Sequence, residues 1–171
     1  MEKKYFSNCN KEISEDDILN GLKDYEIAYY KDGELFKKEI FSYGKLLKVI
    51  YEAKNRDKDS IIKKHIQFYF GVKFSISSVS ENGYTQELYF DETGDYMSKQ
   101  ISFYENQYVY VHEYYNKDND LINGVKYFEE DGDFKLAIEF DSAKKYFYAY
   151  SFETGDAIPL SEALQILGKY S

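Results

Sequence analysis

Glycine-centred turns at nearly regular intervals constrain this chain more than any other feature. Between Tyr25 and Phe152, short aromatic-rich segments are separated by Gly33, Gly44, Gly83, Gly94, Gly124, Gly132 and Gly155. The first two of these glycines are 11 residues apart, about the length of one strand plus one tight turn in an antiparallel meander. Four of them sit in pairs that favour hairpin turns, namely Asp32-Gly33, Asn82-Gly83, Asn123-Gly124 and Asp131-Gly132. The rhythm therefore predicts a mainly β chain.

Alternation of side-chain type supports the same fold. Phe134, Leu136, Ile138 and Phe140 fall on one side of a strand, because successive side chains in a strand point to opposite faces. The pattern predicts strands over residues 25–30, 35–41, 46–51, 61–70, 72–79, 84–90, 96–104, 108–115, 125–128, 134–140 and 146–152. The predicted fold is an antiparallel meander, which could form a twisted sheet, a sandwich or a half-barrel.

Short helices are predicted at both ends of a single domain that spans residues 1–171. Ser14 and Asp17 have the spacing of a capping box and open a helix within an N-terminal helical segment, residues 1–23. The meander covers residues 25–156, and Pro159 opens a C-terminal helix over 159–168. Residues 52–64 fit either a loop or the start of a helix. That helix would be capped by Asp59 or Ser60 and would pack its isoleucines inward.

Negative charge is concentrated in the second part of the chain. Residues 1–73 carry 15 Lys/Arg and 13 Asp/Glu, or +2, whereas residues 74–171 carry 7 and 18, or −11. Such a field repels phosphate backbones and anionic membranes and attracts basic partners. The composition thus predicts no nucleic-acid or membrane binding. The alternative is that acidic turns only keep an aromatic sheet in solution.

The predicted location is cytoplasmic. The first ten residues lack the apolar segment of a secretion signal, and no apolar run reaches the roughly 18 residues that a bilayer requires. Cys9 is the sole cysteine, so no internal disulfide is possible, which suits a reducing compartment.

No recognisable catalytic, metal or cofactor signature is present. The two histidines, His65 and His112, lie outside any metal-binding spacing, and His65 is expected on the polar face of a strand. Phosphate-binding, dinucleotide and serine-hydrolase motifs are missing from the sequence. The chain is therefore predicted not to be an enzyme and to need no cofactor or metal. A two-carboxylate hydrolase remains an alternative, with its acids drawn from Glu87, Glu105, Glu113 and Glu139.

The turn and strand rhythm resembles a known repeat family. In Tyr30–Phe36 and Tyr127–Phe134, an aromatic segment leads into an acid-glycine turn and back to an aromatic residue. This pattern resembles the hairpin repeats of bacterial MORN-variant proteins, which include immunity proteins of polymorphic toxin systems. The chain departs from a standard repeat of that family because it has no tryptophan and no regular glycine-rich spacing.

The expected function is non-enzymatic protein binding. The resemblance implies an immunity protein, and the acidic aromatic surface would occlude a basic toxin domain sterically and electrostatically. The alternative is a β module that binds a small ligand or a carbohydrate. The predicted partner-binding residues are an alternating stripe on one strand and acids in turns: Tyr108, Tyr110, His112, Tyr114, Asp91, Glu92, Asp95, Asp118, Asp120, Glu129, Glu130, Asp131 and Asp133.

Overall fold

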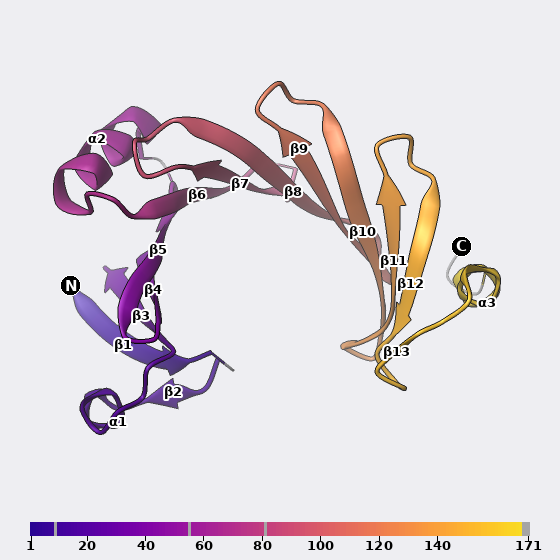
Figure 1. Cartoon of the computed structure of the whole chain (residues 1–171), viewed down its shortest axis with the longest axis horizontal. Helices are drawn as coiled ribbons and strands as arrows, with labels where there is room; N and C mark the ends of the chain where they lie inside the picture. The colour runs from indigo at the N-terminus through magenta and orange to yellow at the C-terminus, as the bar shows by residue number, and fades with distance from the viewer. Residues whose placement is uncertain (9, 55, 81, 169–171) are drawn as a thin grey trace. The chain divides into compact units, whose positions relative to one another are not determined.

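The computed structural model describes residues 1–8, 10–54, 56–80 and 82–168, and in this part of the chain the strands form one open sheet (Figure 1). Its strand order is β13-β12-β11-β10-β9-β8-β7-β6-β5-β4-β3-β1-β2. The bounds are β1 (Glu2–Ser7), β2 (Glu12–Ile13), α1 (Glu15–Leu19), β3 (Tyr25–Lys31), β4 (Glu34–Ser42), β5 (Lys45–Glu52), α2 (Lys58–Phe68), β6 (Lys73–Val79), β7 (Thr85–Phe90), β8 (Tyr96–Asn106), β9 (Val109–Asn116), β10 (Leu121–Glu130), β11 (Asp133–Asp141), β12 (Tyr146–Ser151), β13 (Asp156–Ala157) and α3 (Leu160–Leu167). The predicted mainly β fold with short helices near its ends is confirmed. The segment 1–23, expected to be helical, also contains strands β1 and β2.

One connection departs from the meander. Strands β5 and β6 pair in parallel and are joined by α2, as parallel strands require a crossover, whereas the other described pairs are antiparallel. The strand predicted over 61–70 is therefore wrong, and the alternative helix is correct. Its N-cap is Asp57 rather than the expected Asp59 or Ser60, which lie in the first turn, and the Asp57 carboxylate accepts a hydrogen bond from the Ser60 amide at 2.9 Å.

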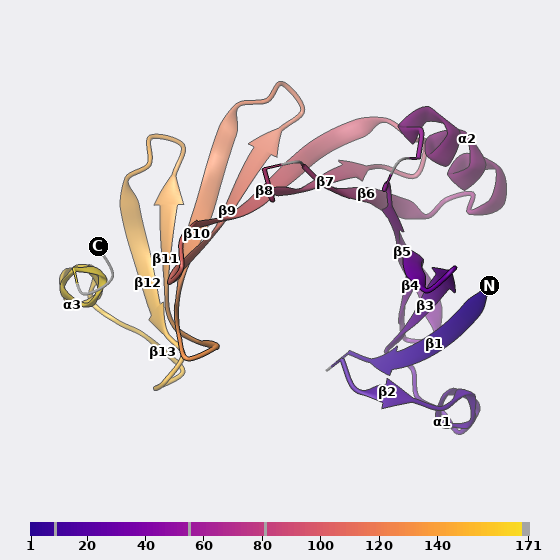
Figure 2. The same ribbon diagram turned by 180° about the vertical axis from the view of Figure 1, so that it is seen from behind.

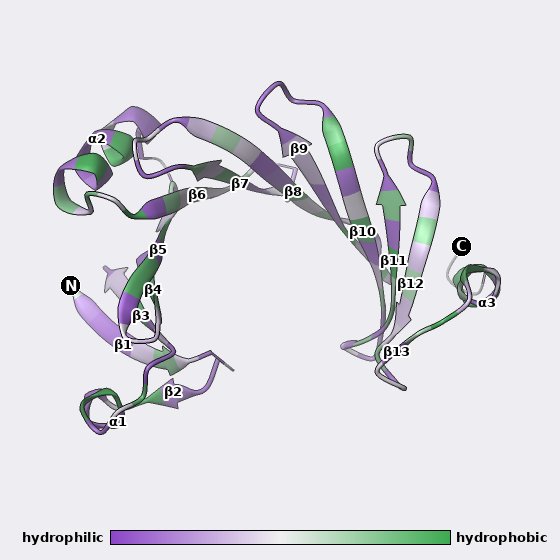
Figure 3. Cartoon of the chain, viewed as in Figure 1, coloured by the Kyte–Doolittle hydropathy of each residue, from purple (hydrophilic) through white to green (hydrophobic). Residues whose placement is uncertain are grey.

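The residues group into two compact units, each with its own buried cluster. The N-terminal unit comprises Met1–Ser78 with Glu87–Met97, and the C-terminal unit comprises Val79–Gln86 with Ser98–Ser171. In the N-terminal unit, α2 packs on a cluster of Val49, Tyr51, Ala53, Ile61, Phe74, Ile76 and Phe90. In the C-terminal unit, α3 packs on a cluster of Val109, Val111, Phe128, Leu136, Ile138, Phe140 and Ala149. Hydrophilic and hydrophobic residues succeed one another along the strands, as one-sided burial requires (Figure 3).

His65 lies in the core of the N-terminal unit, so its predicted surface position is wrong. It is fully buried on α2, one helical turn after Ile61, which places both side chains on the same face. Its Nε2 donates to the Val72 carbonyl at 2.8 Å, and its Nδ1 accepts from the Tyr51 hydroxyl at 3.0 Å. Burial lowers the pKa of His65, which favours the neutral ring that this pairing needs.

The Glu39 carboxylate forms a second buried polar network near His65. Lys37 pairs with Glu39 at 2.5 Å, and the hydroxyls of Tyr29 and Tyr69 both donate to the Glu39 carboxylate. Burial alone would raise the pKa of Glu39, but hydrogen bonds from the Lys37 ammonium and the two tyrosines hold it below its usual range. Burial, followed by the hydrogen bond to the same carboxylate, raises the pKa of both tyrosines. This network is fully paired and serves the packing of α2 against β3 and β4.

The hairpin turn expected at Asn123-Gly124 is wrong. Asn123-Gly124 is not a hairpin turn but lies inside β10, and the turn before it is formed around Asn119, whose φ is 67°. A Cβ atom at Gly124 would lie 2.2 Å from Cζ of Phe140, so the Phe140 ring occupies the space that a side chain would need. Here glycine allows close packing rather than a turn.

Candidate binding surface

One face of the C-terminal unit carries a continuous group of aromatic rings. The α3-covered core uses Val109 and Val111 of β9, so the alternate residues Tyr110, His112 and Tyr114 project from the opposite face. The pairing register extends that face to both neighbouring strands, because Tyr104 and Tyr127 lie directly across from Tyr110. We call the set formed by Tyr104, Tyr110, His112, Tyr114, Tyr127, Phe134 and Phe152 the tyrosine face.

The rings of the tyrosine face touch one another. The centroids of Tyr104 and Tyr110 are 4.8 Å apart, as are those of Tyr110 and His112. Tyr127 meets His112 edge-on at 5.3 Å. On its other side Tyr127 lies 5.2 Å from Phe134. Such mutual contacts restrict rotamers and make the face a rigid surface.

A β-bulge brings Phe134 to this face. Phe128 pairs with Leu136 but Glu129 pairs with Phe134, so β11 contains one extra residue at this point. The expectation that Phe134 shares the core side with Leu136, Ile138 and Phe140 is therefore wrong. Tyr104, Phe134 and Phe152 remain 58%, 40% and 43% exposed. Large apolar groups thus stay accessible to a partner.

His112 is the polar centre of the tyrosine face. Its Nδ1 lies 2.7 Å from both Ser102 Oγ and Gln100 Nε2. Because the amide nitrogen can only donate, Nδ1 is the acceptor, and the ring proton resides on Nε2. Burial lowers the pKa of His112, in keeping with a neutral ring. Ser102 is only 4% exposed, so its hydroxyl orients the imidazole and is poorly placed to attack a substrate.

An acidic end adjoins the tyrosine face. We give this name to Tyr108, Glu129, Glu130, Asp131 and Asp133, which lie where the β8–β9 and β10–β11 hairpins turn. The Glu129 amide donates to the Tyr108 carbonyl at 2.8 Å, which joins the two turns. The Tyr104 hydroxyl donates to the Glu129 carboxylate at 3.3 Å, and burial followed by this carboxylate raises the pKa of Tyr104. Five predicted partner-binding residues are thereby brought together.

Other predicted residues lie elsewhere. Asp118 and Asp120 occupy the β9–β10 turn, at the opposite end of β10 from the acidic end, beside the β11–β12 hairpin (Figures 1 and 2). Both are engaged locally, since their amides donate to the Asn116 side chain at 2.9 Å. The thirteen predicted residues therefore do not form one surface.

The turn that contains Asp91, Glu92 and Asp95 belongs to the N-terminal unit. Asp91 accepts hydrogen bonds from Thr93 and Asp95, and the Thr93 side chain is the main cause of its lowered pKa. Gly94 packs this turn on α2, where a Cβ would lie 2.7 Å from Ile66. Asp91 and Glu92 also line a cavity of about 490 Å³, whose lining includes Lys48 and Lys73.

The candidate hydrolase carboxylates are paired with cations or separated. Glu105 and Glu113 line one cavity of about 140 Å³, below the roughly 300 Å³ at which ligand pockets begin. There they pair with Lys126 and Lys144. Glu87 belongs to the N-terminal unit and pairs with Lys48 at 2.9 Å. Within the described residues, no three ligating groups gather into a metal site. Cys9 lies outside the described residues.

Sequence reasoning missed the part of the tyrosine face outside β9. Tyr104 and Tyr127 join it through strand register, which a single strand's alternation does not specify. Phe152 follows β12 and joins it through ring contacts with Tyr127 and Phe134. The signal that could have found Tyr127 is its position in the acid-glycine hairpin, whose tight turn fixes β11 beside it.

Among the described residues, no helix combines the length and the apolar character needed to cross a membrane. Comparisons with protein-family models, with curated proteins and with solved structures find no match to this chain.

Proposed function

We propose that this chain is a protein-binding module that docks a basic partner on the tyrosine face and the acidic end of its C-terminal unit. The observation that supports this is that accessible aromatic rings and a group of carboxylates lie next to one another on adjoining strands. Tyrosine contributes large contact area with few rotatable bonds, and carboxylates speed encounter with a basic protein. In its most specific form, the partner is a toxin domain and the chain is its immunity protein, which acts by covering a basic active site.

Charge and aromatic contacts have separable roles in this proposal. Asp131 and Asp133 are exposed and Glu129 is half-buried, so solvent screens these carboxylates and they contribute mainly to association rate. The rings of Tyr104, Phe134 and Phe152 lose water on docking and contribute mainly to the lifetime of the complex.

The experiment is co-expression with the product of the neighbouring upstream gene, followed by binding kinetics on the purified pair. We expect a 1:1 complex weakened by salt. The triple variant Glu129→Lys, Asp131→Lys, Asp133→Lys should slow association by about tenfold or more, because electrostatic steering accounts for factors of that size. Glu12→Lys, on an exposed position of β2 in the N-terminal unit, is the matched control and should leave the rate close to wild type.

A second variant tests the rings. Tyr104→Ala removes a side chain that is 58% exposed, so the fold should survive while dissociation accelerates by about tenfold, as for a modest interface hot spot. Tyr84→Ala, at 44% exposure outside the tyrosine face, is the control. A neighbouring gene product that forms no complex would contradict the immunity proposal. A complex indifferent to all of these substitutions would contradict the surface assignment.

A further inference from the structure

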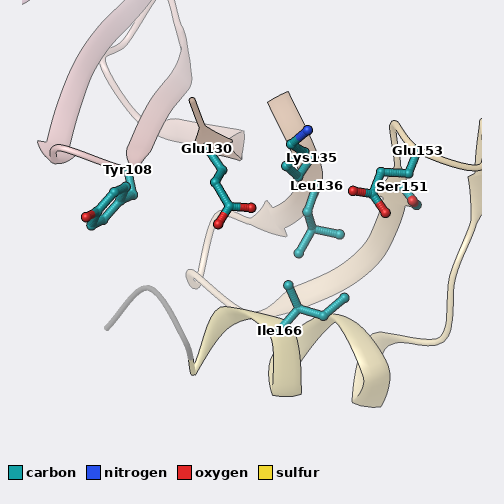
Figure 4. Close-up of a pocket in the computed structure, with 7 residues that line it drawn as sticks. All are labelled: Tyr108, Glu130, Lys135, Leu136, Ser151, Glu153 and Ile166. Carbon is teal, nitrogen blue, oxygen red and sulfur yellow. The ribbon is translucent and has the colours of Figure 1, made fainter. Parts of the chain in front are cut away.

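A cavity of about 400 Å³ opens beside the acidic end, on the α3 side of the C-terminal unit (Figure 4). Its walls come from three places in the chain: Tyr108 before β9, Glu130 at the end of β10, and Glu153 after β12. Leu136 of β11 and Ile166 of α3 point toward each other across it (Figure 4). Its volume falls within the range of about 300 to 1,000 Å³ typical of ligand pockets.

The lining combines an apolar floor with two carboxylates that lack a cation. Leu136 is 1% exposed and belongs to the buried cluster of this unit, so the floor is fixed. Across the described residues, neither Glu130 nor Glu153 forms an ion pair, in contrast to Glu105 and Glu113. The negative charge at the rim is therefore available to a ligand.

The one cation of the lining is directed elsewhere. Lys135 Nζ lies 4.0 Å from the Asp133 carboxylate, and its side chain points away from the carboxylate of Glu130 (Figure 4). Lys135 makes the cavity less negative but forms an ion pair with neither Glu130 nor Glu153. The aromatic ring of Tyr108 adds a third group at the wall that attracts cations.

We propose that this cavity accepts a lysine or arginine side chain of the protein partner. The methylene stem would lie on Leu136 and Ile166, and the cationic head would reach Glu130 and Glu153, the division of contacts that long basic side chains favour. This inference rests on the proposed function, since it names the group through which a basic partner anchors. It adds a site on the sheet face opposite the tyrosine face.

The test uses the whole ¹⁵N-labelled chain and two probes, n-butylguanidinium and n-butylammonium, with 1-butanol as the neutral control. We expect saturable shifts of the amide signals of Glu130, Glu153 and Ile166 with a dissociation constant on the order of 1 to 10 mM, as suits so small a ligand. Butanol at the same concentrations should cause shifts that do not saturate.

Substitutions that remove negative or positive charge from the cavity test whether charge drives probe binding. Glu130→Gln with Glu153→Gln should weaken probe binding by about fivefold or more, and Lys135→Gln should tighten it by about twofold, in line with exposed ion pairs. All three side chains reach solvent, so the amide spectra should show an unchanged fold. Shifts that persist in the double variant, or that butanol reproduces, would overturn the proposal.

The partner complex separates this inference from the proposed function. A complex whose affinity is unchanged by Glu130→Gln and Glu153→Gln would overturn the cation cavity and leave the binding function in place. Saturable probe binding without any partner complex would overturn the proposed binding function and leave the cation cavity in place.

Discussion

Substitution of Gly124 by alanine tests the packing of the C-terminal unit at its tightest point. The added Cβ would lie 2.2 Å from Cζ of Phe140 and 2.6 Å from the His112 carbonyl oxygen, whereas ordinary contact begins at 3.4 Å. The Phe140 ring would have to move by about 1 Å, and it is only 1% exposed, so no open space receives it. The carbonyl belongs to the backbone of β9 and cannot rotate away. Both obstacles must yield at once.

The expected cost is at the upper end of the range for overpacking, about 3 kcal/mol of the free energy of unfolding. Because a domain is typically stable by about 5 to 15 kcal/mol, this loss should lower Tm by about 6 to 12 °C at this chain length. Urea unfolding followed by circular dichroism and by tyrosine fluorescence measures it, since the chain has 20 tyrosines and no tryptophan.

Two further variants make the Gly124 prediction refutable. Gly168→Ala is the matched control, because its Cβ would meet its nearest atom at 3.5 Å and its φ is −58°, so it should be neutral or slightly stabilising. Phe140→Leu removes the far edge of the ring, and in that background Gly124→Ala should cost less than it does in the wild type, a coupling expected of groups in contact, although the contact with the His112 carbonyl remains. A loss below about 0.5 kcal/mol for Gly124→Ala alone would refute the reasoning.

Three other substitutions probe the N-terminal unit. Glu39→Gln leaves Lys37 without its buried carboxylate and should cost about 3 kcal/mol at pH 7. Because the pKa of Glu39 is lower in the folded state, the ionised carboxylate stabilises the fold above the unfolded pKa of about 4.3. That stabilisation disappears as pH falls through the folded pKa. The difference in urea midpoint between wild type and this variant should therefore shrink from pH 7 to pH 3, and a constant difference would contradict the assignment. Tyr51→Phe deprives the buried His65 Nδ1 of its donor and should cost about 1 to 2 kcal/mol in urea unfolding. Asp57→Ala removes the N-cap of α2 and should cost about 1 kcal/mol by the same assay, whereas an unaffected midpoint would show that the cap is dispensable.

Local signals predicted most of the strands because each belongs to a short hairpin. Asp32-Gly33 and Asp131-Gly132 adopt the consecutive positive φ values of a tight turn, 55° and 80° in the first and 55° and 85° in the second. Ser14 and Asp17 form the predicted capping box, with the Ser14 amide donating to the Asp17 carboxylate at 2.8 Å. These features depend on residues close in sequence, so the sequence specifies them.

The errors arose where distant contacts decide the structure. Residues 61–70 contain alternating apolar side chains that fit a strand, but burial of Ile61 and His65 beneath a parallel pair of strands makes the segment helical. The N-terminal strand β1 was not predicted, because its partner β3 lies about twenty residues later. Phe134 changes sides through a bulge that no local rule marks.

The candidate site shows the same division. Alternation along β9 correctly placed Tyr110, His112 and Tyr114 together, and their centroid distances confirm it. It could not show that Tyr108 lies in the turn before β9. It also could not show that the acidic turns lie at opposite ends of the strands and in two different units. Charge was visible in the sequence, whereas its placement depended on where each hairpin begins.

The pairing of most strands with their immediate sequence neighbours has a kinetic consequence. Hairpins such as β10–β11 close over only a few residues, so their contacts can form early at small entropic cost. The β5–α2–β6 crossover is different, because the chain must traverse a helix before its parallel strands can meet. The hairpins of this polypeptide should therefore form quickly, whereas the pairing of β5 with β6 should be slower. The rate of that pairing should depend on how readily α2 forms.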